Sequence, residues 1–387
     1  MRVLIAGAGP AGSSLAVQLA EAGWAVTLVD ALPSPARNAY SSAALPLAEA
    51  DRLGIAGSCR SASWWGWQLL DPNGLQHQWW AVEQQGVVLD FALFRTQLWD
   101  RARQHGVELL NGCRVSLDRL KAQSADVILA SADETQLRTV DLVVDATGPG
   151  RHLQRQAGVA IESREDSLLS GDGVEWLLQG DPRSTAPWRD RLSFMLGRHW
   201  MAHGYGWVFP MAHDQLKVGV CRLPPPHADK VPLGRSLQRL LHRCGLDQLP
   251  VLDRHGGRVA STIRRRQPLG AGALWAVGDA ASTANLLGGE GIRHAMDSAS
   301  VLSECLLTEG SHQDYQVALQ RRFGWRWTVS NRLARKTWWG LNTADGDRRI
   351  TRLIHGLSGQ ASAEDLSSLL FAYRFERYGW RLLPYLV

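Results

Sequence analysis

The residues with the clearest chemical role lie near the start of the chain, where an apolar run, residues 3–6, leads into Gly7-Ala8-Gly9-Pro10-Ala11-Gly12. In such a turn Gly7 permits the tight bend, Gly9 lets a phosphate approach bare backbone, and Gly12 lets a helix pack closely on the strand. The N-terminus of that helix then binds the phosphates. The pattern predicts a dinucleotide site.

An acidic residue follows at the distance that such a site requires. Asp30 ends the next apolar run, residues 24–29, and no arginine comes directly after it. An acid about 20 residues beyond the glycines accepts hydrogen bonds from a ribose 2′-hydroxyl. Strand, turn, helix, strand and acid occur in the expected order, which indicates a dinucleotide with an unphosphorylated ribose.

Two later segments specify the dinucleotide. A buried run, residues 273–277, ends in Gly278-Asp279, and residues 140–151 read as a strand followed by an acidic, glycine-rich turn. Here the chain resembles FAD enzymes of the glutathione-reductase-like superfamily, whose aspartate at this position binds the flavin ribityl chain. Residues 288–296 resemble the loop and helix start that point at the flavin ring. The resemblance implies FAD as the cofactor.

A third resemblance concerns the middle of the chain. Residues 203–210, with Tyr205 and Trp207, are followed by a Val-Gly strand and resemble the Y-x-W-x-F-P motif of the geranylgeranyl reductase family. The loop and helix start of residues 289–295 are also typical of that family. By resemblance, Tyr205 and Trp207 line a pocket above the flavin; the alternative is that they are core aromatics of a half-buried sheet.

The resemblance also implies cofactor contacts outside the first glycine turn. Arg37 follows the second strand at the distance where related flavoproteins place an arginine near the FAD phosphates. The expected cofactor-binding residues are Gly7, Gly9, Pro10, Ala11, Gly12, Asp30, Arg37, Gly148, Gly278, Asp279, Gly289, Gly291 and Ile292.

The reaction implied by the resemblance is reduction of an isolated carbon–carbon double bond of a hydrophobic, isoprenoid-like substrate, with a hydride from reduced FAD and a proton from an acid or water. Tyr205, Trp207, Glu290 and His294 are the candidate catalytic residues. Glu290 and His294 lie one helical turn apart and could transfer protons. A loop-anchoring hydrogen bond for Glu290 and a structural role for His294 remain alternatives, and we expect Asp297 to be solvated.

The chain departs from the family at two places, and other flavoenzyme classes stay open. Residues 40–44 replace a Cys-Gly-Gly-like loop, and residues 283–287 lack the proline that precedes the Gly-Glu-Gly sequence. FAD-dependent monooxygenases acting on an aromatic or amine substrate share the motif order. Flavin-dependent halogenases are disfavoured because their catalytic lysine, expected before the middle of the chain, has no candidate here: the first lysine is Lys121. A cyclase using reduced flavin, and a flavoprotein that modifies or partners another protein, are further alternatives.

Composition narrows the partners and the compartment. The net charge is +5 and the one tight basic run, Arg264–Arg266, reads as a solvated loop, so nucleic acid is not expected. The five cysteines show neither paired spacing nor a C-x-x-C motif, which indicates a reducing compartment and a protein without a metal site. Met1 leads directly into the first strand, so we expect a cytoplasmic protein, or one peripheral on a membrane. No second glycine turn follows a strand, so an external donor, NAD(P)H or a ferredoxin-like protein, must supply electrons.

These motifs require an α/β fold: a Rossmann-like FAD-binding domain interleaved with an antiparallel-sheet substrate domain, plus a helical C-terminal region. The first domain is predicted from residues 1–61, 89–154 and 266–310, the second from 62–88 and 155–265, and the helical region from 311–387. Aromatics beside arginines at 321–339 and 371–380 suit either a membrane interface or a cap whose tryptophans pack on the core.

Overall fold

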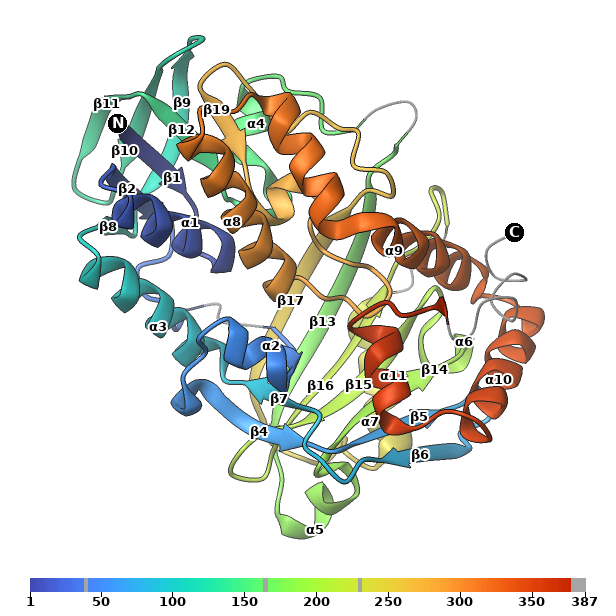
Figure 1. Ribbon diagram of the computed structural model, residues 1–387. Coiled ribbons are helices and arrows are strands. Elements are labelled where there is room, and N and C mark those ends of the chain that lie inside the picture. The colour runs from blue at the N-terminus through green and yellow to red at the C-terminus, as the bar shows by residue number, and fades with distance from the viewer. Residues whose placement is uncertain (38–40, 163–165, 229–231, 377–387) are drawn as a thin grey trace.

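The computed structural model describes residues 1–37, 41–162, 166–228 and 232–376. A parallel sheet with its helices occupies one end of the molecule and a large twisted sheet the other, and the long strands β13 (Leu169–Gln179) and β17 (Val251–Ser261) run between them (Figure 1). The mixed α/β fold with a helical C-terminal region confirms the predicted fold class.

The parallel sheet positions the first motifs. Its order is β18-β19-β12-β1-β2-β8, parallel except for the pairing of β18 with β19. Its strands are β1 (Arg2–Ala6), β2 (Ala25–Asp30), β8 (Glu108–Asn111), β12 (Leu142–Asp145), β18 (Gly270–Ala271) and β19 (Leu274–Ala276). The helices α1 (Pro10–Glu21), α3 (Phe91–Gln104) and α8 (Ile292–Leu307) pack together over it. Sequence segments nearly 300 residues apart thus share one core.

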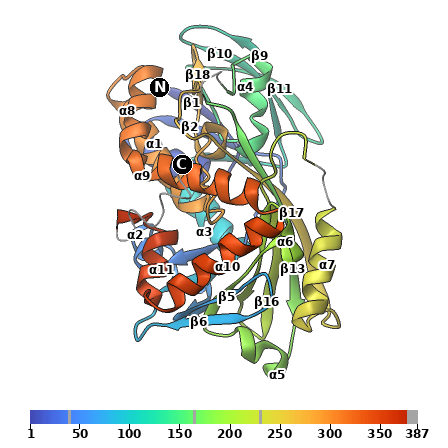
Figure 2. The same ribbon diagram turned by 90° about the vertical axis from the view of Figure 1, so that its right-hand side faces the viewer.

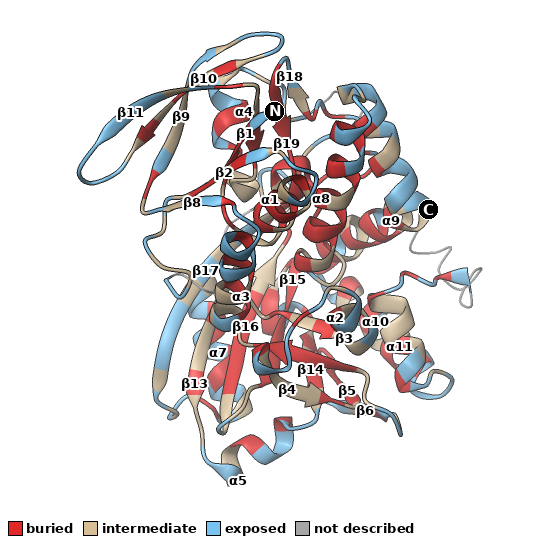
Figure 3. Ribbon diagram, turned by 60° about the vertical axis from the view of Figure 1, so that its left-hand side comes forward, coloured by how far each residue is buried: buried red, intermediate tan, exposed pale blue. Residues whose placement is uncertain are grey.

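A separate three-stranded sheet carries much of the exposed surface at this end. It consists of β9 (Arg114–Leu120), β10 (Ala125–Ala130) and β11 (Thr135–Val140). Figure 3 shows β11 mostly exposed, whereas α1 and α8 are largely buried, and the middle strand β10 alternates buried and intermediate residues.

The large sheet has the order β17-β13-β16-β15-β14-β5-β6. Its other strands are β5 (Gly66–Leu70), β6 (Gln76–Trp80), β14 (Arg191–Leu196), β15 (Gly204–Pro210) and β16 (Gln215–Arg222). It is antiparallel except where β5 pairs with β14 in parallel. A small sheet of β3 (Ala44–Pro46), β4 (Arg60–Trp64) and β7 (Gly86–Leu89) lies beside it. Segment 62–88 is therefore extended, but its strands contribute to two different sheets.

Helix α7 (Leu233–Cys244) was not predicted from the sequence. Leu237, Leu240 and Leu241 follow the i, i+3, i+4 pattern of a buried helix face and pack against one side of the large sheet. Figure 2 shows α7 on that side, with α10 (Ala344–Ser358) and α11 (Ala363–Leu370) on the other. The remaining short helices are α2 (Leu47–Arg52), α4 (His152–Gln156), α5 (Pro182–Thr185) and α6 (Arg198–Met201).

The C-terminal region is mainly helical up to Leu370, and residues 371–375 follow without a helix. Helix α9 (His312–Gly340) contains a non-helical residue, Gly324, with φ of +66°. Trp327 and Trp338 are buried, whereas Trp325 is exposed; the cap interpretation therefore fits most of these tryptophans, and residues 377–380 lie outside the described part. Among the described helices, none is both long and apolar enough to cross a membrane.

Candidate active site

The first glycine turn has the shape of a phosphate cradle. Gly7 has φ of +110°, and a Cβ there would lie 2.3 Å from the Ala146 carbonyl oxygen. A Cβ on Gly12 would lie 1.9 Å from the Gly7 oxygen, so both positions require glycine. A Cβ on Gly9 would meet nothing within 4 Å. Gly9 begins α1 without a side-chain cap, so the helix N–H groups next to Pro10 and Ala11 remain available for an anion.

Asp30 lies at the end of β2 against this turn. Its Oδ2 accepts a hydrogen bond from the Ala8 N–H at 2.8 Å, and its Oδ1 accepts one from the Leu32 N–H at 2.8 Å. Each carboxylate oxygen retains a second lone pair, which a ribose hydroxyl can use. The position therefore fits the expected ribose contact.

A buried arginine beside this turn was missed by the sequence analysis. Arg37 is exposed, and its carbonyl oxygen accepts a hydrogen bond from Arg95 Nη1 at 3.2 Å. Arg95, on α3, is buried and lies over the ring of Trp99, whose Nε1 donates to the Ala8 carbonyl at 2.8 Å. The available signal was its spacing: Arg95, Trp99 and Ala102 follow the i, i+4, i+7 pattern of one buried helix face.

Asp279 lies in a turn whose preceding residue must be glycine. Gly278 has φ of +65°, and a Cβ there would lie 2.7 Å from the Ala11 Cβ of α1. Burial raises the pKa of Asp279 to about 7, partly offset by the positive charges of Arg151 and Arg265. A Cβ on Gly291 would lie 3.9 Å from Asp279 Oδ1, so the carboxyl group faces the start of α8. A partly protonated carboxyl suits the hydroxyls of a ribityl chain.

Two buried arginines support this turn. Arg151 Nη2 donates to Ser282 Oγ at 2.6 Å, and Arg265 Nη2 donates to the Ser282 carbonyl at 2.8 Å. Arg265 also lies over the rings of Phe323 and Trp327. The prediction that Arg264–Arg266 form a solvated loop is therefore wrong for Arg265. Side chains along this segment point alternately outward and inward, so Arg265 is buried while its two neighbours are exposed.

The loop before α8 forms a tight hairpin. The Asn285 N–H donates to the Glu290 carbonyl at 2.7 Å, and Gly289 has φ of +71°. A Cβ on Gly289 would lie 2.9 Å from the hydroxyl oxygen of Tyr205. Gly291 is the N-cap of α8 and Ile292 its first residue. Gly148 (φ +67°) opens the turn after β12, which contacts the Asp279 turn, and a Cβ there would meet nothing within 4 Å.

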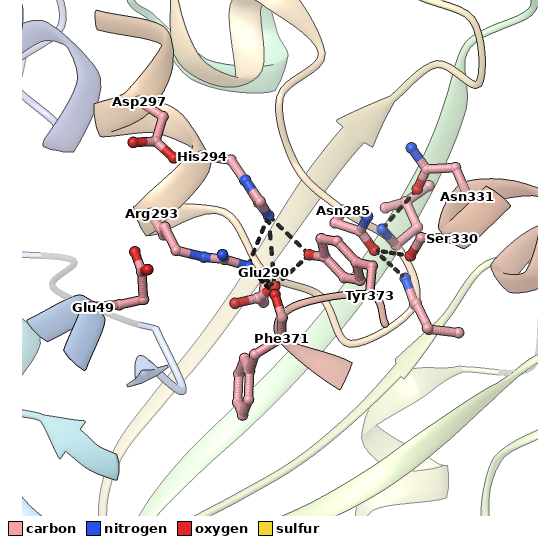
Figure 4. A network of polar contacts seen from close by, with 12 residues as sticks. Glu49, Asn285, Glu290, Arg293, His294, Asp297, Ser330, Asn331, Phe371 and Tyr373 are labelled. Atoms are coloured by element: carbon pink, nitrogen blue, oxygen red, sulfur yellow. Dashed lines mark hydrogen bonds and ion pairs between the residues drawn. The ribbon is translucent and has the colours of Figure 1, made fainter. Parts of the chain in front are cut away.

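A buried polar network fixes this hairpin to the C-terminal region (Figure 4). The Tyr373 hydroxyl donates to Glu290 Oε2, and Arg293 Nη2 donates to the same oxygen at 2.8 Å and to the Phe371 carbonyl at 2.5 Å. The positive charge of Arg293 and hydrogen bonds from His294 and Tyr373 outweigh burial and lower the pKa of Glu290. Glu290 is therefore ionised, and its contacts with Arg293 and Tyr373 connect the loop to the C-terminal region.

His294 lies behind the hairpin and outside the residues that line the cavity. Its Nε2 lies 2.8 Å from the Tyr373 hydroxyl, and its ring meets Trp327 edge-on at 4.8 Å. Burial and the charge of Arg293 lower the pKa of His294 to about 4, so it is neutral at pH 7. The expectation of a solvated Asp297 is wrong: it is buried and pairs with Arg52 at 3.0 Å and Arg322 at 2.8 Å, because α9 covers this face of α8.

A cavity of about 290 Å³ lies between the hairpin and the large sheet. Its wall brings together Tyr205, Trp207 and Glu290 with the 41–45 and 288–293 segments. Its other aromatic lining residues are Phe194, Phe209, Trp338 and Phe371. Such an aromatic-rich space next to a cofactor cradle suits an apolar ligand.

The cavity floor is one face of the large sheet. One cross-strand row contains, in register, Phe194, Trp207, Gly219, Glu175 and His255. A Cβ on Gly219 would lie 2.2 Å from Trp207 Cζ2, so the missing side chain lets the indole lie across the strand. Trp207 Nε1 then donates to Glu175 Oε2 at 2.9 Å. Glycine in the strand thus determines where the tryptophan points.

Two further buried groups were missed from the sequence. Lys217 Nζ donates to the Ser41 carbonyl at 2.6 Å and to the Leu89 carbonyl at 2.9 Å, so it ties the cavity rim to the small sheet. Burial lowers the pKa of Lys217 and raises the pKa of Glu175. Burial also raises the pKa of Tyr205, whose hydroxyl therefore keeps its proton. The sequence signal was a single charged residue between apolar neighbours in each strand.

Comparisons with known proteins indicate the same cofactor. Residues 1–44 match the model of an FAD binding domain. The chain is 27% identical over 372 residues to a menaquinone reductase of Mycolicibacterium smegmatis, covering 86% of this chain and 83% of the relative. It is 28% identical over 311 residues to a digeranylgeranylglycerophospholipid reductase of Haloferax volcanii, covering 77% and 74%.

Among solved structures, a geranylgeranyl bacteriochlorophyll reductase-like protein of Thermoplasma acidophilum has a TM-score of 0.82 at 20% identity, covering 100% of this chain and 99% of that one. This likeness concerns the fold. Taken with the glycine cradle, the Asp279 turn and the curated relatives, it confirms the FAD prediction. The chain is an FAD-dependent oxidoreductase that resembles the geranylgeranyl reductase-like flavoproteins.

Proposed function

We propose that this protein reduces a carbon–carbon double bond of a hydrophobic, isoprenoid-like substrate bound in the cavity. The observation that carries the proposal is the aromatic-lined cavity that borders the Gly288–Arg293 hairpin, to which the resemblance assigns the flavin side of the site. The names of the two curated relatives, both reductases of isoprenoid compounds, support the same substrate class. The donor is external, NAD(P)H or a ferredoxin-like protein.

The chain's own residues are proposed to bind and orient the alkene and to exclude water. When bound and reduced, FAD supplies the hydride. Tyr205 and Trp207 hold the substrate between the hairpin and the sheet, and Glu290 keeps the hairpin in place through Arg293 and Tyr373. His294 supports that arrangement from behind.

The second hydrogen must arrive as a proton. Glu175 lines the cavity, and its Oε1 is buried with no hydrogen-bond partner among the described residues, while Oε2 is held by Trp207. We infer that Glu175 holds this proton. The neighbouring His255, paired with the exposed Asp253 at 3.4 Å, is placed to restore it from solvent.

The test uses the purified full-length protein with its bound flavin. We expect FAD to copurify and, after anaerobic reduction, to be reoxidised rapidly by a geranylgeranyl lipid, whose product gains two hydrogens by mass spectrometry. A fully saturated lipid of equal length is the matched control and should leave the flavin reduced. Insertion of one oxygen atom when air is admitted would instead support a monooxygenase. Absence of bound FAD would overturn the proposal.

A further inference from the structure

A second cluster of chemically able side chains lies at the far end of the large sheet, away from the cavity. Asp71 follows β5, His77 lies in β6, and His355 lies in α10. One donor atom from each lies within 4.8 Å of the others. Figure 1 shows α10 beside the β5–β6 hairpin, and α10 packs on β6.

Two of these donor atoms lack a partner. Asp71 is 1% exposed; its Oδ1 accepts from the N–H groups of Asn73 and Leu75 at 2.8 and 2.9 Å, which closes the hairpin turn. Its Oδ2 and His77 Nε2 are both buried without a hydrogen-bond partner among the described residues. Buried polar atoms are normally satisfied, so two unpartnered atoms on residues of one such cluster indicate a missing bridging group.

The donor set indicates what the bridging group is. Two imidazoles and one carboxylate are typical ligands for Zn²⁺ and similar ions. Ligand atoms of a tetrahedral zinc site lie about 3.4 Å apart, given bonds of about 2.1 Å. The exposed His355 ring, now edge-on to His77 with centroids 5.0 Å apart, can rotate to close the difference.

We propose that Asp71, His77 and His355 bind a divalent transition-metal ion of the Zn²⁺ class, with water completing the coordination. The ion would join the C-terminal helical region to the β5–β6 hairpin. Helix α10 contributes Ile350 and Ile354 to the same apolar cluster as the cavity aromatics. The site would therefore hold the helical cap in place over the substrate cavity without taking part in the redox chemistry.

The test is a calorimetric titration of Zn²⁺ into the chelator-treated full-length protein. We expect one equivalent to bind per chain, and Co²⁺ in its place to show visible absorption bands. Thermal unfolding should shift to higher temperature in excess Zn²⁺, because the ion binds the folded state.

The variants His355→Ala and Asp71→Asn should weaken Zn²⁺ binding by more than about tenfold and abolish the thermal shift. The matched control is His242→Ala, which removes another exposed helical histidine and should bind Zn²⁺ like the wild type. His355 is exposed, so its replacement leaves the fold intact. Lack of Zn²⁺ binding to the wild-type protein, or equal binding to His355→Ala, would overturn the proposal.

Discussion

The two faces of the large sheet are built from the same strands but differ in what covers them. On one face, Val174, Val208 and Val218 pack against Leu237 and Leu240 of α7 in a continuous apolar core. On the other, glycines and polar groups take alternate positions, and the cavity lies above them. A face covered by a helix becomes core, whereas a face left partly open by missing side chains becomes a binding site.

The largest expected effect comes from breaking the packed face. Leu240→Ala should lower the free energy of unfolding by about 3 kcal/mol, because it leaves a cavity in a fully packed layer. Denaturant unfolding measures this change. Affinity for the lipid substrate should stay at the wild-type value, and a loss of affinity would show that the two faces are not independent.

A matched pair of glycine variants sharpens the comparison. A Cβ on Gly206 would lie 2.1 Å from Leu240 Cδ1, whereas a Cβ on Gly173 would come no closer than 3.4 Å to Cys221 Cβ. Gly206→Ala should cost about 2 kcal/mol of stability through overpacking. Gly173→Ala should change stability by less than about 0.5 kcal/mol but raise the KM for the lipid. Equal effects on stability would contradict the distinction.

The smallest effect concerns the pH dependence of stability. Burial raises the pKa of Glu175, so the folded state binds its proton more tightly than the unfolded state, and the contribution of Glu175 to stability falls as the pH rises above about 4.3. Glu175→Gln removes this loss, so the variant gains relative stability with pH, by roughly 1.4 kcal/mol per unit of pKa shift. Unfolding at several pH values measures it. The difference in unfolding free energy between Leu240→Ala and the wild type should not vary with pH. If the difference between Glu175→Gln and the wild type were equally independent of pH, the buried-acid role of Glu175 would be refuted.

The nucleotide half of the fold could be predicted because its signals are local. The backbone of the first turn needs glycine at three positions, Gly7, Gly9 and Gly12, and the neighbouring residues already define that need. Asp30 follows after one helix and one strand, whose lengths set its distance from the turn. The cofactor-binding residues stay predictions, and two of them, Arg37 and Gly289, are exposed in the structure.

Other features depended on partners distant in the sequence. Arg265 and Asp297 looked like surface residues, yet α9 buries the first under Phe323 and pairs the second with Arg322. Helix α7 was missed because its leucine pattern lies among prolines and predicted strands. The sequence does not show that a sheet face is available for these leucines to pack against. The domain boundaries and the catalytic roles of Tyr205, Trp207, Glu290 and His294 stay predictions.

The sequence by itself determined the dinucleotide site, the α/β class and the order of the motifs, because glycine turns and strand-end acids are short-range requirements of backbone geometry, and the family resemblance of its motifs then implied FAD. Only the tertiary structure decided which sheet face is the cavity, since alternation along a strand defines two faces without saying which is covered. It also decided that Glu175 lies under Trp207, that Tyr373 anchors Glu290, and that two histidines meet Asp71, because each contact joins segments that come together only when the sheets and the helical cap pack.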